Sequence, residues 1–150
     1  MTHRAVVRGV GVSVGNEGPG APAVVLEVRG ELLPIYVSAD QAQSMQLAMR
    51  GRHFERPLTH DLLVDMVAEF GGAIDKVRID DLADGTFFAK IDAEQYVGGE
   101  SREVVFDARP SDAIAIALRA DCPIFVSDAV VDRAGYHPEE FSLQGFDEDE

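Results

Sequence analysis

Residues 110–118 (Pro-Ser-Asp-Ala-Ile-Ala-Ile-Ala-Leu) constrain the fold more than any other part of the sequence. Pro110 fits the first position of a helix, where its missing N–H is not needed for an intrahelical hydrogen bond. The helix that would follow carries apolar side chains on almost every side. A helix of this kind is buried, because it has no polar face to turn towards water. The sequence therefore predicts a helix over residues 111–118 in the middle of the fold.

Six stretches rich in β-branched or alternating apolar residues precede this helix, in two groups of three. The first group covers residues 5–14, 23–28 and 32–37, and the second covers residues 77–82, 86–91 and 102–106. Asp84-Gly85 separates two strands of the second group and is a strong hairpin signal, because its turn needs positive φ at both central positions. Each group is predicted to form a three-stranded meander, and residues 123–126 to form a short last strand.

Two further helices are predicted between the two groups of strands. Ser38 can cap the first helix while Gln41 reaches back to it, which is a capping box. Thr59 is predicted to cap the second helix. The apolar stripe of that second helix consists of Leu62, Leu63, Met66, Val67 and Phe70. Residues 129–134 are a weaker candidate for a short helix. The pattern indicates an α+β fold: a single domain with a mostly antiparallel sheet of two three-strand meanders, packed with three helices.

Length and cysteine content limit the class of protein. A chain of 150 residues can bury one core without disulfides or structural metals. A single cysteine, Cys122, excludes an internal disulfide and fits a reducing compartment. The sequence shows no leader peptide and no apolar run of about 20 residues, so we expect a soluble, cytoplasmic protein without membrane contact. We expect the domain to cover residues 1–134 and residues 135–150 to form a disordered acidic tail.

The net charge of −14 is the most unusual compositional feature. It arises from 27 acidic and 13 basic residues, and only two of the bases, Lys76 and Lys90, are lysines. A chain this acidic repels itself in dilute buffer, whereas in about 1 M salt the Debye length falls to about 3 Å and the repulsion is screened. Acidic residues spread along the whole chain, together with almost no lysine, therefore indicate a halophilic protein. An acidic protein that avoids nucleic acid or binds basic partners is the alternative.

Two segments share an unusual order of residue types. Residues 56–61 (Arg-Pro-Leu-Thr-His-Asp) and residues 107–112 (Asp-Ala-Arg-Pro-Ser-Asp) each place Arg-Pro before a helix, then a hydroxyl, then an aspartate in its first turn. A helix start has unpaired N–H groups and a partial positive charge, so an arginine beside it completes an anion site. If the fold brings the two segments together, they could hold a phosphodiester through Arg56, Thr59, Arg109 and Ser111.

The same segments carry groups for acid/base chemistry. The candidates are His60, Asp61, Asp107 and Asp112, whose carboxylates could alternatively ligate a divalent metal such as Mg²⁺ or Mn²⁺. Asp107 directly follows an apolar strand and precedes a helix, which should place it near the edge of the sheet. The residues also have ordinary structural interpretations. The hydroxyls can be helix caps, the aspartates can favour the helix dipole, the arginines can form ion pairs that hold loops, and the histidine can lie at the surface.

These two segments resemble the bifunctional nuclease family. The resemblance extends to residues 33–36 (Leu-Pro-Ile-Tyr), 84–89 (Asp-Gly-Thr-Phe-Phe-Ala) and 123–126 (Pro-Ile-Phe-Val), and it runs from about residue 5 to residue 131. It implies an α+β fold and nuclease activity on RNA and DNA, an activity ascribed to plant members. It also implies a homo-oligomer, most simply a dimer. The roles given to individual residues above come from their chemistry and not from the family.

The negative net charge is an obstacle for a nuclease. Much of the affinity for nucleic acid normally comes from basic side chains that contact phosphates, and an acidic surface repels those phosphates. Recognition would then depend on short-range contacts such as arginine forks and helix N–H groups. Two functions stay open from the sequence. One is a nuclease with RNA or DNA as substrate. The other is a non-catalytic module that binds an anion or assembles into oligomers.

Overall fold

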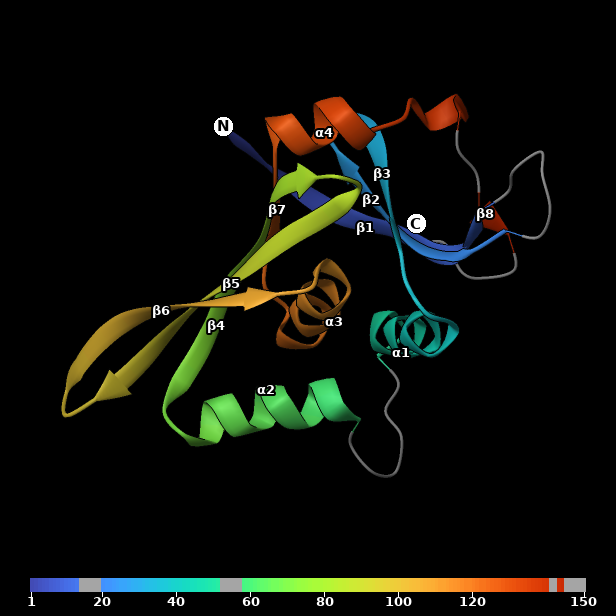
Figure 1. Cartoon of the computed structure of the whole chain (residues 1–150). Coiled ribbons are helices and arrows are strands. Elements are labelled where there is room, and N and C mark those ends of the chain that lie inside the picture. Colours follow the sequence, from blue (N-terminus) through green and yellow to red (C-terminus); the bar gives the residue numbers. More distant parts are fainter. Residues whose placement is uncertain (14–19, 52–57, 141–142, 145–150) are drawn as a thin grey trace.

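The computed structural model describes residues 1–13, 20–51, 58–140 and 143–144. Its strands are β1 (Thr2–Ser13), β2 (Pro22–Val28), β3 (Glu31–Tyr36), β4 (Gly72–Ala83), β5 (Thr86–Val97), β6 (Glu100–Ala108), β7 (Ile124–Ser127) and β8 (Leu143–Gln144). All of them belong to one sheet with the order β3-β2-β1-β7-β4-β5-β6, and β8 pairs with the end of β1. Figure 1 shows this path with the helices around it.

The α+β class and the two antiparallel groups of three strands are confirmed, but two details of the prediction are wrong. The groups are not separate meanders, because β7 lies between them and pairs antiparallel to β1 and parallel to β4. The described residues also form four α-helices and not three, since Asp128–Ala134 is a full helix, α4. A short strand such as β7, with Ile124 and Val126 buried, needs partners on both edges, and its sequence does not specify which strands those are.

The turns and caps follow the sequence in most places. Asp84 and Gly85 have φ of 52° and 77°, as the predicted hairpin turn requires. The first helix, α1 (Ala39–Met49), starts with the predicted capping box, in which Gln41 N donates to Ser38 Oγ over 3.1 Å and Ser38 N donates to Gln41 Oε1 over 2.9 Å.

The predicted cap of the second helix is wrong. Leu58 and not Thr59 is the N-cap of α2 (Thr59–Glu69), and Leu58 N donates to the Asp61 carboxylate over 3.1 Å. A carboxylate at the third helical position can accept from the backbone N–H of the N-cap residue, which is the half of a capping box that Asp61 supplies here. Ser111 is not a cap either, because α3 (Pro110–Ala120) has Arg109 as its N-cap and contains Ser111 within its first turn.

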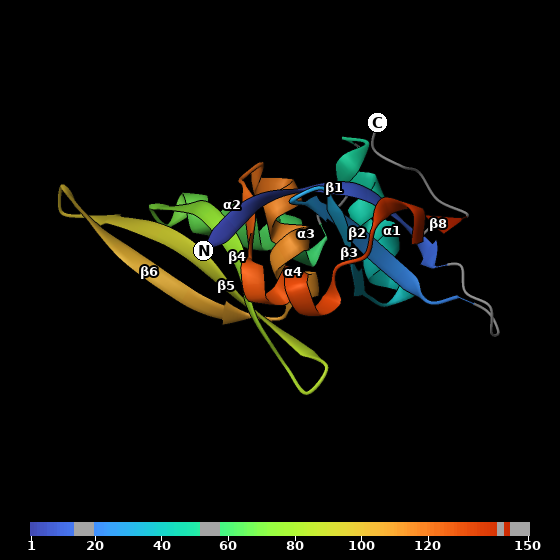
Figure 2. The same ribbon diagram turned by 90° about the horizontal axis from the view of Figure 1, so that it is seen from above.

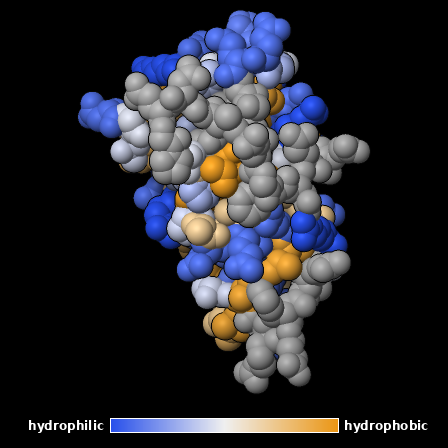
Figure 3. Space-filling model, turned by 90° about the vertical axis from the view of Figure 1, so that its right-hand side faces the viewer, coloured by the Kyte–Doolittle hydropathy of each residue, from blue (hydrophilic) through white to orange (hydrophobic). Residues whose placement is uncertain are grey.

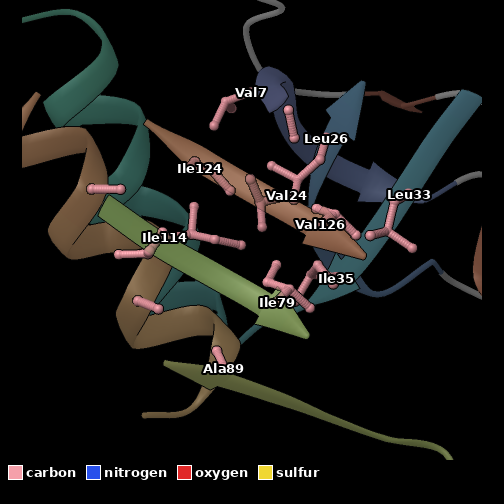
Figure 4. Close-up of a cluster of buried hydrophobic side chains, with 14 of the residues drawn as sticks. Val7, Val24, Leu26, Leu33, Ile35, Ile79, Ala89, Ile114, Ile124 and Val126 are labelled. Atoms are coloured by element: carbon pink, nitrogen blue, oxygen red, sulfur yellow. The ribbon is translucent and has the colours of Figure 1, made fainter. Parts of the chain in front are cut away.

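The third helix lies at the centre of the fold, as its apolar sequence predicts. Five consecutive residues from Ala113 to Ala117 are buried, and Ile114 is fully enclosed. Figure 4 shows Ile114 in one cluster with side chains from both halves of the sheet, including Val24 of β2, Ile79 of β4 and Ile124 of β7. The core therefore joins both halves of the sheet around α3.

The sheet curls around this core. Both α3 and α4 contact β3 and β4, although three other strands separate these two in the sheet. In a flat sheet that separation would be about 19 Å at roughly 4.8 Å per strand, too far for one short helix to cover. In Figure 1, α4 lies at the top of the molecule and α2 at the bottom, with α3 and α1 between them. The β5–β6 hairpin extends beyond the body of the domain in both Figure 1 and Figure 2.

The segment predicted as a disordered tail contains ordered pairings in its described part. Tyr136 exchanges backbone hydrogen bonds of 2.7 and 2.8 Å with Leu32. A 3-10 helix, η1 (Pro138–Glu140), follows, and β8 then pairs with the end of β1. Among the described residues, no helix combines the length and hydropathy that a membrane crossing requires.

Candidate functional site

A cleft of about 840 Å³ opens between α2 and the β5–β6 hairpin. One wall comes from Leu63 and Val67 of α2 and from its C-cap residue Phe70, and the opposite wall comes from β6 through Val104 and Phe106. Ile74, Ile91, Ala93 and Ile116 line the cleft from β4, β5 and α3. None of the residues of α2 is buried. The apolar stripe of this helix, which in sequence resembles an ordinary core face, thus borders an open cleft.

The described parts of the two segments with matching residue order meet at one end of this cleft. Thr59 and His60 reach it from the start of α2, and Asp107, Arg109 and Asp112 reach it from the end of β6 and the start of α3. His60 Nε2 lies 3.0 Å from Asp112 Oδ1, and Arg109 Nε donates to Asp112 Oδ2 over 2.7 Å. The residues converge because β6 leads directly into α3 and α2 packs against α3.

Asp112 is a fixed negative charge between two nitrogen groups. Burial raises the pKa of this carboxyl, but hydrogen bonds from Arg109 and His60 outweigh burial and bring the pKa below its ordinary value of 3.8. Because folding lowers this pKa, the contribution to stability is present above pH 3.8 and is lost as the pH falls through the lowered value. Near neutral pH, Asp112 is therefore ionised and can hold the His60 ring in one orientation.

Asp107 and Arg109 are the exposed members of the group. The Asp107 side chain is 79% exposed, and Lys90 Nζ donates to its Oδ1 over 3.1 Å. Arg109 is 73% exposed, and its bond to Asp112 uses only Nε. A guanidinium has five N–H donors, so the terminal nitrogens of Arg109 can meet an anion in the cleft.

Asp61 and Ser111 are placed elsewhere, although both lie in the first turns of the same helices. Asp61 Oδ1 accepts from Arg119 Nε over 2.7 Å, while its Oδ2 accepts from Leu58 N. Ser111 Oγ accepts from Gln41 Nε2 over 3.0 Å. Neither residue lines the cleft that the described residues form. Arg56 lies outside the described residues, so the expected pairing of two arginines is represented here by Arg109 alone.

Sequence reasoning missed Arg119, which connects three helices. Its side chain in α3 is 6% exposed and donates to Asp61 in α2 and to the Ser44 hydroxyl in α1, over 2.7 and 2.6 Å. It also donates to the backbone oxygens of Ser44 and Ala115, each over 3.2 Å. The sequence did carry a signal for this role: Arg119 lies near the end of a helix that is otherwise mostly apolar and predicted to be buried. A guanidinium buried with such a helix requires polar or acidic partners.

The carboxylates of the cleft do not form a complete metal cage. Across the described ranges, no group of three or more His, Cys, Asp or Glu side chains could hold an ion by itself. Mg²⁺ usually keeps several waters and is bound through one or two carboxylates together with substrate phosphates. Asp107 meets that smaller requirement, because its exposed carboxylate lies at the polar end of the cleft.

Comparison with known proteins gives a consistent family match. The family model described as "Bifunctional nuclease domain" matches residues 24–139. An uncharacterized protein of Mycobacterium tuberculosis is 40% identical over 131 residues, which are 86% of this chain and 75% of that protein. "Bifunctional nuclease 1" of Arabidopsis thaliana is 36% identical over 109 residues, and "Bifunctional nuclease 2" of Oryza sativa subsp. japonica is 33% identical over 113 residues. These matches cover 71% and 73% of this chain but only 33% and 34% of the plant proteins.

Proposed function

The chain belongs to the bifunctional nuclease domain family, and we propose that it hydrolyses phosphodiester bonds of RNA or DNA at the polar end of its cleft. One observation carries this proposal. The starts of α2 and α3 face the same open cleft and bring a histidine and an exposed arginine within hydrogen-bonding distance of the same carboxylate. These are the groups that proton transfer and phosphate binding require.

His60 is the proposed acid/base group. Its Nε2 is bonded to Asp112, which leaves Nδ1 to take a proton from the attacking water. The ionised Asp112 orients the ring and stabilises the positive charge that develops on it. In the reaction, a P–O bond to the water oxygen forms and the P–O bond to the leaving oxygen breaks. The leaving oxygen then receives a proton from the imidazolium or from solvent.

Arg109 and Thr59 are the proposed phosphate-binding groups. The terminal nitrogens of Arg109 would donate to the non-bridging oxygens, and the hydroxyl of Thr59 lies at the start of α2, where the helix dipole favours an anion. Asp107 would hold a hydrated Mg²⁺ or Mn²⁺ together with the substrate phosphate. Such a cation would neutralise charge on the phosphate oxygens.

A cleavage assay tests the proposal. We expect the wild-type protein to cut a labelled single-stranded RNA or DNA oligonucleotide with Mg²⁺ or Mn²⁺, and to lose activity with EDTA. Asp107→Ala should weaken metal-dependent cleavage, whereas Asp65→Ala, on the exposed side of α2, should leave it unchanged.

We also propose that the acidic surface is adapted to concentrated salt, so activity should persist in about 1 M KCl. Absence of cleavage at every salt and metal condition would remove the nuclease proposal.

The exposed apolar surface of α2 favours assembly as a second candidate function. Leu62 and Met66 lie outside the cleft and are 49% and 50% exposed, so the outward side of this helix is not covered. An amphipathic helix owes most of its stability to burial of its apolar face. In Figure 3, apolar side chains appear towards the lower end of the molecule, the level at which Figure 1 places α2. We propose that a second copy covers this side in a homodimer.

Light scattering after size-exclusion chromatography tests the dimer. Met66→Asp should convert the dimer to monomer, because it places a charge in the proposed interface. Val6→Asp makes the same kind of change at a residue of β1 with 52% exposure and should leave the dimer intact. A monomeric wild-type protein at tens of micromolar would contradict this proposal and leave the nuclease proposal unaffected.

A further inference from the structure

Most of the cleft is unnecessary for cutting a phosphodiester bond. The proposed chemistry uses polar groups at one end, whereas the remaining walls are largely apolar. Two of these apolar side chains are aromatic and accessible: Phe70, the C-cap residue of α2, is 75% exposed and Phe106 of β6 is 53% exposed. A folded domain normally buries side chains of this size, so their exposure at an open cleft indicates a ligand with flat apolar surfaces.

We propose that this apolar part of the cleft is a subsite for the unpaired bases of a single strand, with Phe70 and Phe106 as stacking surfaces. The inference rests on the proposed function and names the class of substrate that the site selects. Bases stack on aromatic side chains without regard to sequence, since every base has a π-face. In a duplex the faces of the bases are covered by their neighbours, so only a strand with splayed bases can enter.

The charges around the cleft agree with this occupant. Arg109 lies at the end with His60, and Arg102 lines the cleft from the hairpin, so phosphates can meet a guanidinium on either side of the apolar part. The three carboxylates that line the cleft all have partners. Asp112 is bonded to His60 and Arg109, Asp107 accepts from Lys90, and Glu94 accepts from the Tyr96 hydroxyl over 2.6 Å. The apolar walls thus face neutral bases, and the cations face the backbone.

Stacking also resolves the difficulty that the net charge of −14 creates for nucleic-acid binding. Affinity that comes from released counterions falls steeply as salt rises, whereas contact between a base and an aromatic ring does not depend on counterions. We therefore expect the affinity for single strands to depend only weakly on salt. A plot of the logarithm of the binding constant against the logarithm of the salt concentration should have a shallower slope than is usual for proteins that bind nucleic acid.

A tryptophan reporter tests the subsite directly. The chain contains no tryptophan, so Phe106→Trp introduces a single fluorophore into the cleft. Three probes with a phosphorothioate backbone, which resists hydrolysis, are compared: a single strand, the same strand in a duplex, and an abasic strand of equal length. We expect the single strand to quench the fluorescence and to bind at least tenfold more tightly than the other two. Equal binding of the abasic strand would overturn the inference, because that probe has phosphates but no bases.

Alanine variants of the full chain separate the rings from general effects. Phe106→Ala and Phe70→Ala should each weaken single-strand binding by about 5- to 150-fold, the range expected for loss of one stacked base. Phe88→Ala is the matched control, because Phe88 is 42% exposed but does not line the cleft, and it should bind as the wild type does. Thermal unfolding checks that each variant is folded.

The outcomes distinguish the two proposals. Cleavage that shows no preference for single strands and is unchanged in both phenylalanine variants would overturn the base subsite and leave the nuclease proposal standing. A protein that neither cleaves nor binds any of the three probes would overturn both. Dimerisation that is lost in Phe106→Ala, with no change in strand binding, would assign these rings to a second copy of the chain and overturn the subsite.

Discussion

Replacing His60 with alanine is expected to lower phosphodiester cleavage by about 10²- to 10⁴-fold, the usual contribution of a positioned acid/base group. His60 is the one imidazole at the polar end of the cleft as the described residues form it, and its contact of 3.0 Å with Asp112 fixes which nitrogen faces the substrate. The effect should be seen in the rate constant of cleavage measured under single-turnover conditions. Strand binding should change little, because the proposed phosphate and base contacts lie on other residues.

Two variants give this prediction its controls. His137→Ala makes the same substitution at an exposed histidine far from the cleft residues in sequence, and it should retain full activity. Asp112→Asn keeps a hydrogen-bonding side chain but removes the charge beside His60, so its rate should fall between those of the wild type and His60→Ala. Cleavage by His60→Ala within a factor of three of the wild type would contradict the role of this residue.

The second large effect is expected on stability. Arg119→Met should lower the free energy of unfolding by about 3–5 kcal/mol, because it removes one partner of a largely buried ion pair and leaves Asp61 without its cation. The side chains of Arg119 and Asp61 are only 6% and 19% exposed. For a domain of this size the loss corresponds to a decrease in Tm of roughly 6–20 °C, measured by calorimetry or circular dichroism.

An exposed ion pair with the same geometry provides the comparison. Arg109 Nε and Asp112 Oδ2 are also 2.7 Å apart, but Arg109 is 73% exposed, so Arg109→Met should lower the free energy of unfolding far less than Arg119→Met does. Adding Asp61→Asn to Arg119→Met removes the unpaired charge and retains an acceptor for Leu58 N, so it should recover part of the loss. Equal destabilisation by the two arginine variants would show that burial does not decide the difference.

Arg119 also links stability to the candidate site. Its side chain binds Asp61 at the start of α2 and Ser44 in α1. His60 directly precedes Asp61 in the sequence, so its position depends on this contact. Loosening this connection should let the His60 ring move relative to Asp112. The Arg119→Met variant is therefore expected to be less active as well as less stable, even though its side chain is not among those that line the cleft.

Features that depend on neighbouring residues were predictable from the sequence. The capping box of Ser38 and Gln41, the Asp84-Gly85 turn and the burial of Ile114 each follow from residues within a few positions of one another. The pairing of β7 was not predictable in this way. Its four residues can be recognised as a strand, but the choice of β1 and β4 as partners depends on how the whole sheet curls around α3.

The candidate site shows the same division. The sequence singled out His60 and Asp112 as helix-start residues, but their meeting across 52 positions requires α2 to pack against α3. It could not separate Asp112, which lines the cleft, from Asp61, which has the same place in its own helix and turns to Arg119. The stripe through Leu63 and Phe70 was recognised as apolar, but its place at an open cleft was not predictable, because hydrophobic periodicity identifies an apolar face and not what covers it.

We propose that a phosphodiester binds where His60, Asp112 and Arg109 meet. The most direct measurement is the NMR spectrum of the histidine rings during titration with a phosphorothioate single strand. We expect the His60 resonances to shift during the titration while those of His3 and His137 stay constant. Saturation of binding with unchanged His60 resonances would contradict it, because the strand would then occupy another surface of the protein.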